Sequence, residues 1–188
     1  DTVFNLRLNC YPANLESLME LAESLYRIPQ VREHVALYLA PVESDTVETF
    51  LPLDYANAHI RFTEHLYNLG WYSQVRNAMV SRRSSPCDLL KPEGFIADYA
   101  GNFYACENHI GRVSSRIATF HNDIAYIQAQ KKTQLCAYDR SLTERCKNCA
   151  YFPLCFSGCP MYRRSDSQCA TFQKMVLGIL EINSRISG

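Results

Sequence analysis

Four cysteines lie within the stretch CKNCAYFPLCFSGCP, residues 146 to 160, with the spacing C-x2-C-x5-C-x3-C. A thiolate is a soft ligand that suits zinc or an iron-sulfur cluster, and two cysteines separated by two residues can bend around one metal centre. The chain holds nine cysteines, an odd number, and five of them follow residue 145. Such clustering favours metal binding over disulfides in a reducing compartment.

Three further cysteines, Cys87, Cys106 and Cys169, extend this pattern to seven. Zinc sites commonly use two C-x2-C pairs, whereas the second pair here is spaced C-x3-C. Two 4Fe-4S clusters with four cysteines each would need one cysteine more than these seven. The spacing alone therefore leaves both zinc and iron-sulfur chemistry open.

Taken together, the cysteines resemble the seven-cysteine signature of the SPASM domain, the C-terminal extension of radical S-adenosylmethionine (SAM) enzymes that mature peptides and proteins. Cys87 is followed after thirteen residues by Gly101, then after four by Cys106, and nine residues separate Cys159 from Cys169. The resemblance covers residues 87 to 169 closely. Residues 1–80 resemble only loosely the last strands and helices of the family's partial (β/α)6 barrel.

The resemblance implies two auxiliary 4Fe-4S clusters, which in the family pass an electron away from the substrate radical or bind substrate at an open iron. The first cluster would be held by Cys87, Cys106 and Cys159. The second would be held by Cys146, Cys149, Cys155 and Cys169. Cys159 would thus leave its sequence neighbours and join the cysteines that flank Gly101.

The first cluster lacks a fourth cysteine in this assignment. Fully ligated relatives often carry a cysteine six residues before the position of Cys87, and Ser81 stands there in this chain. Cys136, His109, a water or a substrate group could fill the position, or one iron could stay open. The sulfatase-maturing branch of the family places a catalytic carboxylate after the cysteine matched by Cys106. Glu107 occupies that place, either as a general base or as an ordinary solvent-facing charge.

The C-x3-C-x2-C motif that binds the SAM-cleaving cluster does not occur in this sequence. S-adenosylmethionine and a third 4Fe-4S cluster would therefore belong to an N-terminal region that precedes these residues. The start at Asp1, inside a strand unit and without methionine, favours a fragment of a longer enzyme over a degenerate partner subunit. In either case the chain alone should not generate a radical.

The first part of the chain has the pattern of a strand, a helix and a second strand. Residues 1–10 alternate apolar and polar side chains, which is the period of a strand. A helix follows from Asn14 to Pro29, and residues 34–42 form a second strand that is most simply parallel to the first. A further helix is predicted from Asp54, as its cap, to Gly70.

The stretch SRRSSPCDLLKPEG, which begins at residue 81, marks a boundary between residues 1–80 and 81–188. Beyond it we expect a hairpin that turns at residues 100–102, with Gly101 in a positive backbone angle. Helices are predicted over residues 117–130 and 172–180. The predicted fold class is α+β, with the end of a barrel followed by a small cysteine-rich domain of a hairpin and helices.

Lys and Arg together number 19 and Asp and Glu also number 19, so no net positive field attracts nucleic acid or an anionic membrane. No apolar run of about 18 residues and no signal peptide occurs, which predicts a cytoplasmic protein. We expect the substrate to be a peptide or a protein. We also expect the exposed barrel edge to be covered, either by the missing N-terminal region or by self-association. The alternative is a structural zinc-binding or peptide-binding module without catalysis.

Overall fold

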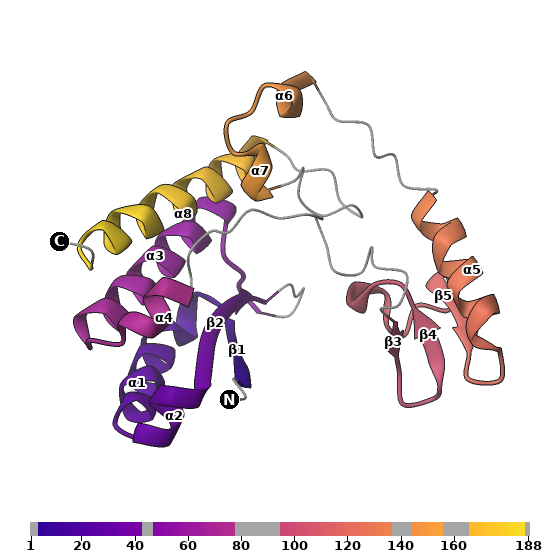
Figure 1. Cartoon of the computed structure of the whole chain (residues 1–188), viewed down its shortest axis with the longest axis horizontal. Helices are drawn as coiled ribbons and strands as arrows, with labels where there is room; N and C mark the ends of the chain where they lie inside the picture. Colours follow the sequence, from indigo (N-terminus) through magenta and orange to yellow (C-terminus); the bar gives the residue numbers. More distant parts are fainter. Residues whose placement is uncertain (1–3, 43–46, 78–94, 137–143, 156–165, 187–188) are drawn as a thin grey trace. The chain divides into compact units, whose positions relative to one another are not determined.

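The structure, a computed structural model, describes residues 4–42, 47–77, 95–136, 144–155 and 166–186. The chain divides into two compact units, residues 1–81 with 165–188 and residues 82–164 (Figure 1). The elements of the first unit are β1 (Phe4–Cys10), a 3-10 turn (Pro12–Asn14), α1 (Leu15–Tyr26), α2 (Pro29–His34), β2 (Val35–Pro41), α3 (Pro52–Asn68), α4 (Tyr72–Asn77) and α8 (Asp166–Ser184).

The two strands of the first unit are parallel neighbours, as the sequence predicts. Their register runs from Phe4 opposite Val35 to Cys10 opposite Pro41. Parallel strands need a crossover connection between them, and α1 with α2 provides it. The alternation along β1 separates a face that turns toward the core from a face of Asn and Arg side chains.

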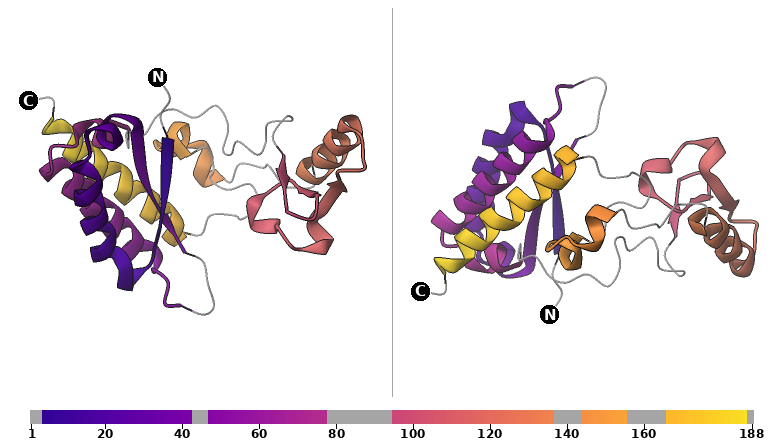
Figure 2. Two further views of the ribbon diagram at one scale, coloured as in Figure 1. Left: turned by 90° about the horizontal axis from the view of Figure 1, so that it is seen from below. Right: turned by 90° about the horizontal axis from the view of Figure 1, so that it is seen from above.

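The helices of this unit gather on one side of the sheet (Figure 2). Side chains from the apolar face of the sheet pack with residues of α1 and α3, so that the sheet and these helices enclose one core. The buried members of this core are Leu8, Cys10, Leu15, Ala22, Leu39, Ala58, Phe62, Leu66, Trp71, Val75 and Ile182.

The boundaries of α3 differ at one end from those the sequence predicts. Pro52 occupies the first turn and Leu51 is the N-cap, so Asp54 is not the cap. Proline fits the first turn because its missing N–H would have no helical partner there, and Asp54 still benefits from the positive end of the helix dipole. The predicted end is confirmed, because Gly70 follows the helix with φ +82°.

The C-terminal helix α8 belongs to the first unit, whereas the sequence placed residues 81–188 together. Ile182 of α8 is 2% exposed in the core of the first unit. A Cβ atom at Gly178 would lie 2.6 Å from Cδ1 of Ile60 on α3, so the two helices approach closely. The Arg185 guanidinium also donates to the Glu64 carboxylate at 2.7 Å.

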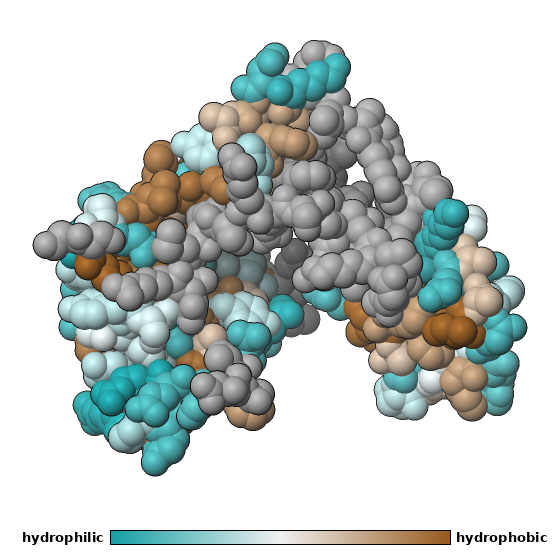
Figure 3. Space-filling model, viewed as in Figure 1, coloured by the Kyte–Doolittle hydropathy of each residue, from teal (hydrophilic) through white to brown (hydrophobic). Residues whose placement is uncertain are grey.

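The other face of α8 is apolar in part. Leu177 and Leu180 are 57% and 48% exposed, and Figure 3 shows hydrophobic residues along this helix. Across the part of the chain that the structure describes, no helix combines the length and hydropathy needed to cross a membrane.

The second unit contains a small antiparallel sheet of three strands in the order β3-β4-β5. The helices and strands are β3 (Ile96–Ala97), β4 (Asn102–Tyr104), 3-10 turns (Glu107–His109 and Val113–Ser115), β5 (Arg116–Thr119), α5 (Ile124–Cys136), α6 (Glu144–Lys147) and α7 (Phe152–Cys155). The predicted hairpin before Cys106 is confirmed as β3 and β4.

The predicted helix over residues 117–130 is wrong in its first half. Ile117 and Ala118 lie in β5, which pairs with β4. The helix begins only at Ile124, after an Asp123 carboxylate that accepts the N–H of Tyr126 at 2.8 Å. Such a side-chain acceptor at the start of a helix replaces a missing backbone partner. Ile117, Ala118 and Ile127 form a small core.

Candidate cluster-binding site

The β3–β4 hairpin is organised by the carboxylate of Asp98. Its Oδ1 accepts the backbone N–H groups of Ala100 and Asn102, both at 2.9 Å. Its Oδ2 accepts the Tyr104 hydroxyl at 3.0 Å and the Asn102 side-chain amide at 2.9 Å. These hydrogen bonds, first those from Asn102, lower the pKa of Asp98. Because this one carboxylate accepts four hydrogen bonds from residues 100–104, it holds the turn in place.

Gly101 completes this turn with φ +75°, as the sequence predicts. A side chain at this position would be strained by the backbone angle and would also overlap the Phe120 ring. The turn reverses the chain so that β4 leads directly to Cys106. Asp98 is a residue that sequence reasoning missed, although Asp followed at short distance by Gly and Asn is typical of such turns.

Cys106 is buried at 6% exposure and begins the turn that contains Glu107 and His109. The His109 backbone N–H donates to the Cys106 carbonyl at 3.0 Å. The His109 side chain is buried, and its Nδ1 has no hydrogen-bond partner among the residues that the structure describes. Burial, and then the Arg112 charge, lower the pKa of His109. A neutral imidazole with an unused nitrogen has the character of a metal ligand.

Glu107 is exposed to solvent in the same turn. The structure thus places Glu107 on the surface, in the turn that begins at Cys106.

Cys146 and Cys149 lie in one turn of the second unit. The Cys149 N–H donates to the Cys146 carbonyl at 3.3 Å, and the Phe152 N–H donates to the Cys149 carbonyl at 3.0 Å. The chain then enters α7, at whose end the Cys155 N–H donates to the Tyr151 carbonyl at 3.0 Å. All three cysteines are half-buried. Cys146 and Cys149 therefore share one turn, the local arrangement that C-x2-C pairs adopt around a metal centre.

The remaining expected ligands have other positions. Cys169 is half-buried on α8, in the first unit. Cys87 and Cys159 lie outside the described residues, as does Ser81. Cys136 ends α5. Within the described ranges, no three His, Cys, Asp or Glu side chains come together in a group that could hold a metal ion.

The donor chemistry would fit an iron-sulfur cluster or zinc, because the candidate ligands that the structure describes are half-buried or buried thiols. The structure places Cys146 and Cys149 in one turn and Cys106 at the base of the hairpin.

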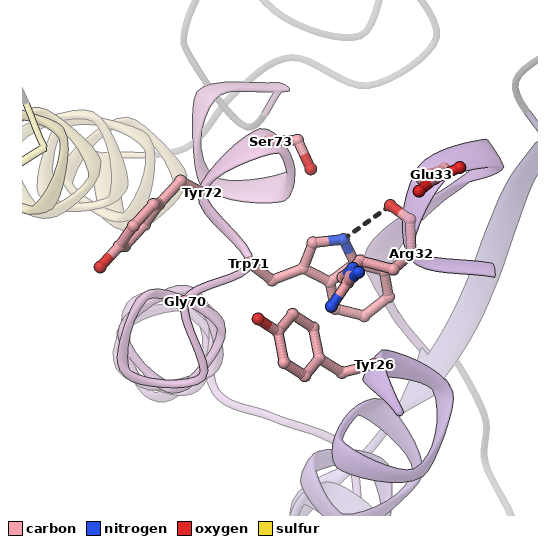
Figure 4. Close-up of a pocket in the computed structure, with 7 residues that line it drawn as sticks. All are labelled: Tyr26, Arg32, Glu33, Gly70, Trp71, Tyr72 and Ser73. Carbon is pink, nitrogen blue, oxygen red and sulfur yellow. Dashed lines mark hydrogen bonds between the residues drawn. The ribbon is translucent and has the colours of Figure 1, made fainter. Parts of the chain in front are cut away.

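A cavity of about 450 Å³ lies in the first unit, beside α2 and α4 (Figure 4). The Arg32 guanidinium lies over the Tyr26 ring, 5.3 Å from its centroid, and the Tyr26 and Trp71 rings are 5.7 Å apart. The Trp71 indole N–H donates to the Arg32 carbonyl at 3.1 Å. The cavity is lined by Tyr26, Arg32, Glu33, Gly70, Trp71, Tyr72 and Ser73.

The cavity therefore lies where the end of α1, α2 and the start of α4 pack together. Trp71 is 1% exposed and belongs to the core of the first unit. Its only polar atom is used by the backbone, and the arginine is held by its contact with Tyr26. Sequence reasoning did not predict this cavity.

Three titratable side chains lie near the ends of β1 and β2: Cys10 is buried, and Tyr55 and His59 are half-buried. Burial raises the pKa of the Cys10 thiol to about 11, and it also raises the pKa of Tyr55, whose hydroxyl donates to the Leu39 carbonyl at 3.1 Å. Burial lowers the pKa of His59 to about 4. All three groups are therefore neutral at pH 7.

Comparison of the chain with protein families, with curated proteins and with solved structures gives no match.

Proposed function

We propose that this chain is the auxiliary-cluster part of a radical SAM enzyme that modifies a peptide or protein substrate. The observation that carries the proposal is the spacing of seven cysteines around Gly101, from Cys87 to Cys169. Two auxiliary 4Fe-4S clusters would serve for electron transfer or would bind substrate at an open iron. The proposed compartment is the cytoplasm, where thiols stay reduced.

Features of both units support the proposal. In the second unit, Asp98 and Gly101 hold a tight hairpin that ends at Cys106, and Cys146 and Cys149 share one turn. In the first unit, β1, α1 and β2 form a parallel strand-helix-strand unit, the repeating element of a (β/α)6 barrel. These local structures are compatible with the ligand assignment.

The proposed ligand sets follow the assignment from the resemblance. The first cluster would take Cys87, Cys106 and Cys159, and the second would take Cys146, Cys149 and Cys155 with Cys169 from α8. His109 is the best-supported candidate for a fourth ligand of the first cluster, because it shares a turn with Cys106 and its buried Nδ1 lacks a partner among the described residues. The SAM-cleaving cluster would come from a region that carries C-x3-C-x2-C.

A zinc-binding or peptide-binding module without redox chemistry is the second candidate. The turn that contains Cys146 and Cys149 favours it equally, since a C-x2-C turn is also the usual half of a zinc site. In this case the chain would be structural, or a degenerate partner subunit, and Glu107 would have no catalytic role.

Visible absorption and metal analysis of protein purified without oxygen distinguish the two candidates. The proposal predicts a brown protein with a broad band at about 400 nm that contains iron and sulfide. Cys149→Ala should lose much of this band. Cys10→Ala should keep it, because Cys10 lies in the core of the sheet. A colourless protein with stoichiometric zinc and no iron would refute the iron-sulfur proposal and support the zinc module.

A further inference from the structure

The two outer edges of the β1–β2 sheet differ in their backbone hydrogen bonds. Successive residues of a strand direct their N–H and C=O groups alternately to the two sides. The Val42 N–H donates to the Cys10 carbonyl at 2.9 Å, so the even-numbered residues of each strand bond toward the other strand. The odd-numbered residues therefore present their backbone groups at the outer edges.

The outer edge of β2 is closed by side chains. The Leu37 N–H donates to Oε1 of Gln74 at 2.8 Å, and Nε2 of Gln74 donates to the Val35 carbonyl. The Tyr55 hydroxyl donates to the Leu39 carbonyl at 3.1 Å. Pro41, the last residue of the strand, has no N–H to offer. Another strand cannot pair at this edge without displacing these groups.

Among the residues that the structure describes, no strand lies beside most of the outer edge of β1. The Asn14 side chain donates to the Asn9 carbonyl at 3.0 Å and so closes the end of this edge. Before that point, no residue in the described part of the chain pairs with the outward backbone groups of Asn5 and Arg7. A short row of unpaired donors and acceptors is a template for a further strand.

The core-facing side of β1 is also incomplete at this edge. Leu8 is 4% exposed, but Leu6 on the same face is 39% exposed and Phe4 is 65% exposed. A strand added beside β1, with apolar side chains at alternate positions, would cover Leu6 and Phe4 while its backbone pairs with Asn5 and Arg7. The open edge and the exposed apolar side chains thus coincide.

We propose that β1 of a second copy of this chain occupies this edge, antiparallel to the first and related to it by a two-fold axis at Leu6. Asn5 then pairs with Arg7 of the second copy, and Arg7 pairs with Asn5, through the outward backbone groups. Leu6 faces its own counterpart, and Phe4 faces Leu8. The product is one four-stranded sheet, β2-β1-β1-β2, with a continuous apolar face.

The side chains of β1 are complementary to themselves in this register. Each Arg7 guanidinium lies opposite an Asn5 amide, and every apolar residue lies opposite another apolar residue. A two-fold axis at Arg7 would instead place the two guanidinium groups opposite each other, and like charges in that position destabilise a strand pair. The register centred on Leu6 also uses only Phe4 to Leu8, the part of the edge that Asn14 leaves open.

Sedimentation equilibrium over a range of protein concentrations tests the dimer. The intact chain should reach twice its 21.5 kDa mass. Arg7→Pro should be a monomer, because it removes an outward N–H that the β1–β2 ladder does not use, and proline is tolerated on edge strands. Arg7→Ala is the matched control: it keeps the N–H and should stay a dimer. A dimer that persists in Arg7→Pro, or an intact chain that remains a monomer, would overturn the proposal.

Amide hydrogen exchange of the unmodified chain gives a test that does not depend on a variant's folding. Protection of the Asn5 and Arg7 amides should rise with protein concentration, while protection of the Leu37 amide, which Gln74 holds, should not change. Exchange of Asn5 and Arg7 that is independent of concentration would mean that a second copy does not cover this edge. The dimer does not rest on the proposed cluster chemistry, because neither test involves a metal. In the proposed enzyme the missing N-terminal region would cover this edge instead, and that longer chain would then exchange Asn5 and Arg7 independently of concentration.

Discussion

Gln74 closes the edge of β2 by accepting the backbone N–H of Leu37 at 2.8 Å. The glutamine is 4% exposed, and its amide acts in place of a neighbouring strand, since it also donates to the carbonyl of Val35. A side chain from α4 thus occupies the outer edge of β2. Without it, a further parallel or antiparallel strand could extend the sheet at this edge.

Replacement of Gln74 by Leu should lower the free energy of unfolding by about 2 kcal/mol, because it leaves a part-buried N–H and a part-buried C=O without partners. Urea denaturation measures this change, and exchange of the Leu37 amide should accelerate in parallel. Gln30→Leu, on the exposed surface of α2, should change stability by less than about 0.5 kcal/mol. Equal effects of the two substitutions would contradict the role of Gln74.

The assignment of α8 to the first unit predicts a difference between two of its residues. Ile182→Ala should destabilise the protein by about 2 to 4 kcal/mol, because Ile182 is 2% exposed in the core that contains Trp71. Leu180→Ala, at 48% exposure on the same helix, should cost well under about 1 kcal/mol. Urea unfolding followed by Trp71 fluorescence measures both. A loss of stability in Leu180→Ala as large as that in Ile182→Ala would contradict this packing.

His59 predicts a pH dependence of stability. Burial lowers its pKa from 6.5 to about 4 in the folded protein, so below pH 6.5 the unfolded chain binds the proton more readily. The contribution of His59 to the free energy of unfolding is fully present above pH 6.5. It is lost as the pH falls toward 4, by about 3 kcal/mol over this range. Urea unfolding at a series of pH values measures the slope.

Two substitutions separate His59 from the other groups that titrate in this range. His59→Leu should remove most of the slope between pH 6.5 and 4. His34→Leu, at an exposed position on α2, should keep it. A slope that persists unchanged in His59→Leu would assign the pH dependence to other groups.

Asp98 predicts a local effect on the hairpin before Cys106. Asp98→Ala removes the acceptor for the backbone N–H groups of Ala100 and Asn102, so exchange of the Asn102 amide should accelerate. The pKa of Asp98 is lowered by its donors. The ionised Asp98 carboxylate therefore stabilises the folded protein above the pKa of the unfolded chain, about 3.9. This stabilisation is lost as the pH falls through the lower pKa of the folded state. Substitution of the fully exposed Tyr99 by Ala should leave the Asn102 amide protected.

Much of the first unit follows from local patterns in the sequence. Alternation in β1, the proline after α1 and the glycine after α3 give the strand-helix-strand unit and its ends, because each depends on residues close together in the chain. The placement of α8 could not be predicted in this way. Its contacts with Ile60 and Glu64 join segments more than a hundred residues apart, and an amphipathic helix does not specify its partner.

The second unit shows a different limit of sequence reasoning. Ile117 and Ala118 fit a helical period when taken with Phe120 and Ile124, but pairing with β4 makes them a strand. Tertiary pairing overrides local periodicity when a short apolar run fits both. Cys146 and Cys149 share a local turn, while the gathering of distant cysteines depends on long-range structure that spacing does not define.

Iron and sulfide per chain, measured after purification and cluster reconstitution without oxygen, test the central proposal most directly. Two 4Fe-4S clusters predict about eight iron and about eight sulfide per chain. Cys149→Ala should lower both to about four, and Cys10→Ala should leave both at about eight. A chain that binds no iron under these conditions, or whose iron is unchanged in Cys149→Ala, would contradict the assignment of these cysteines to auxiliary clusters.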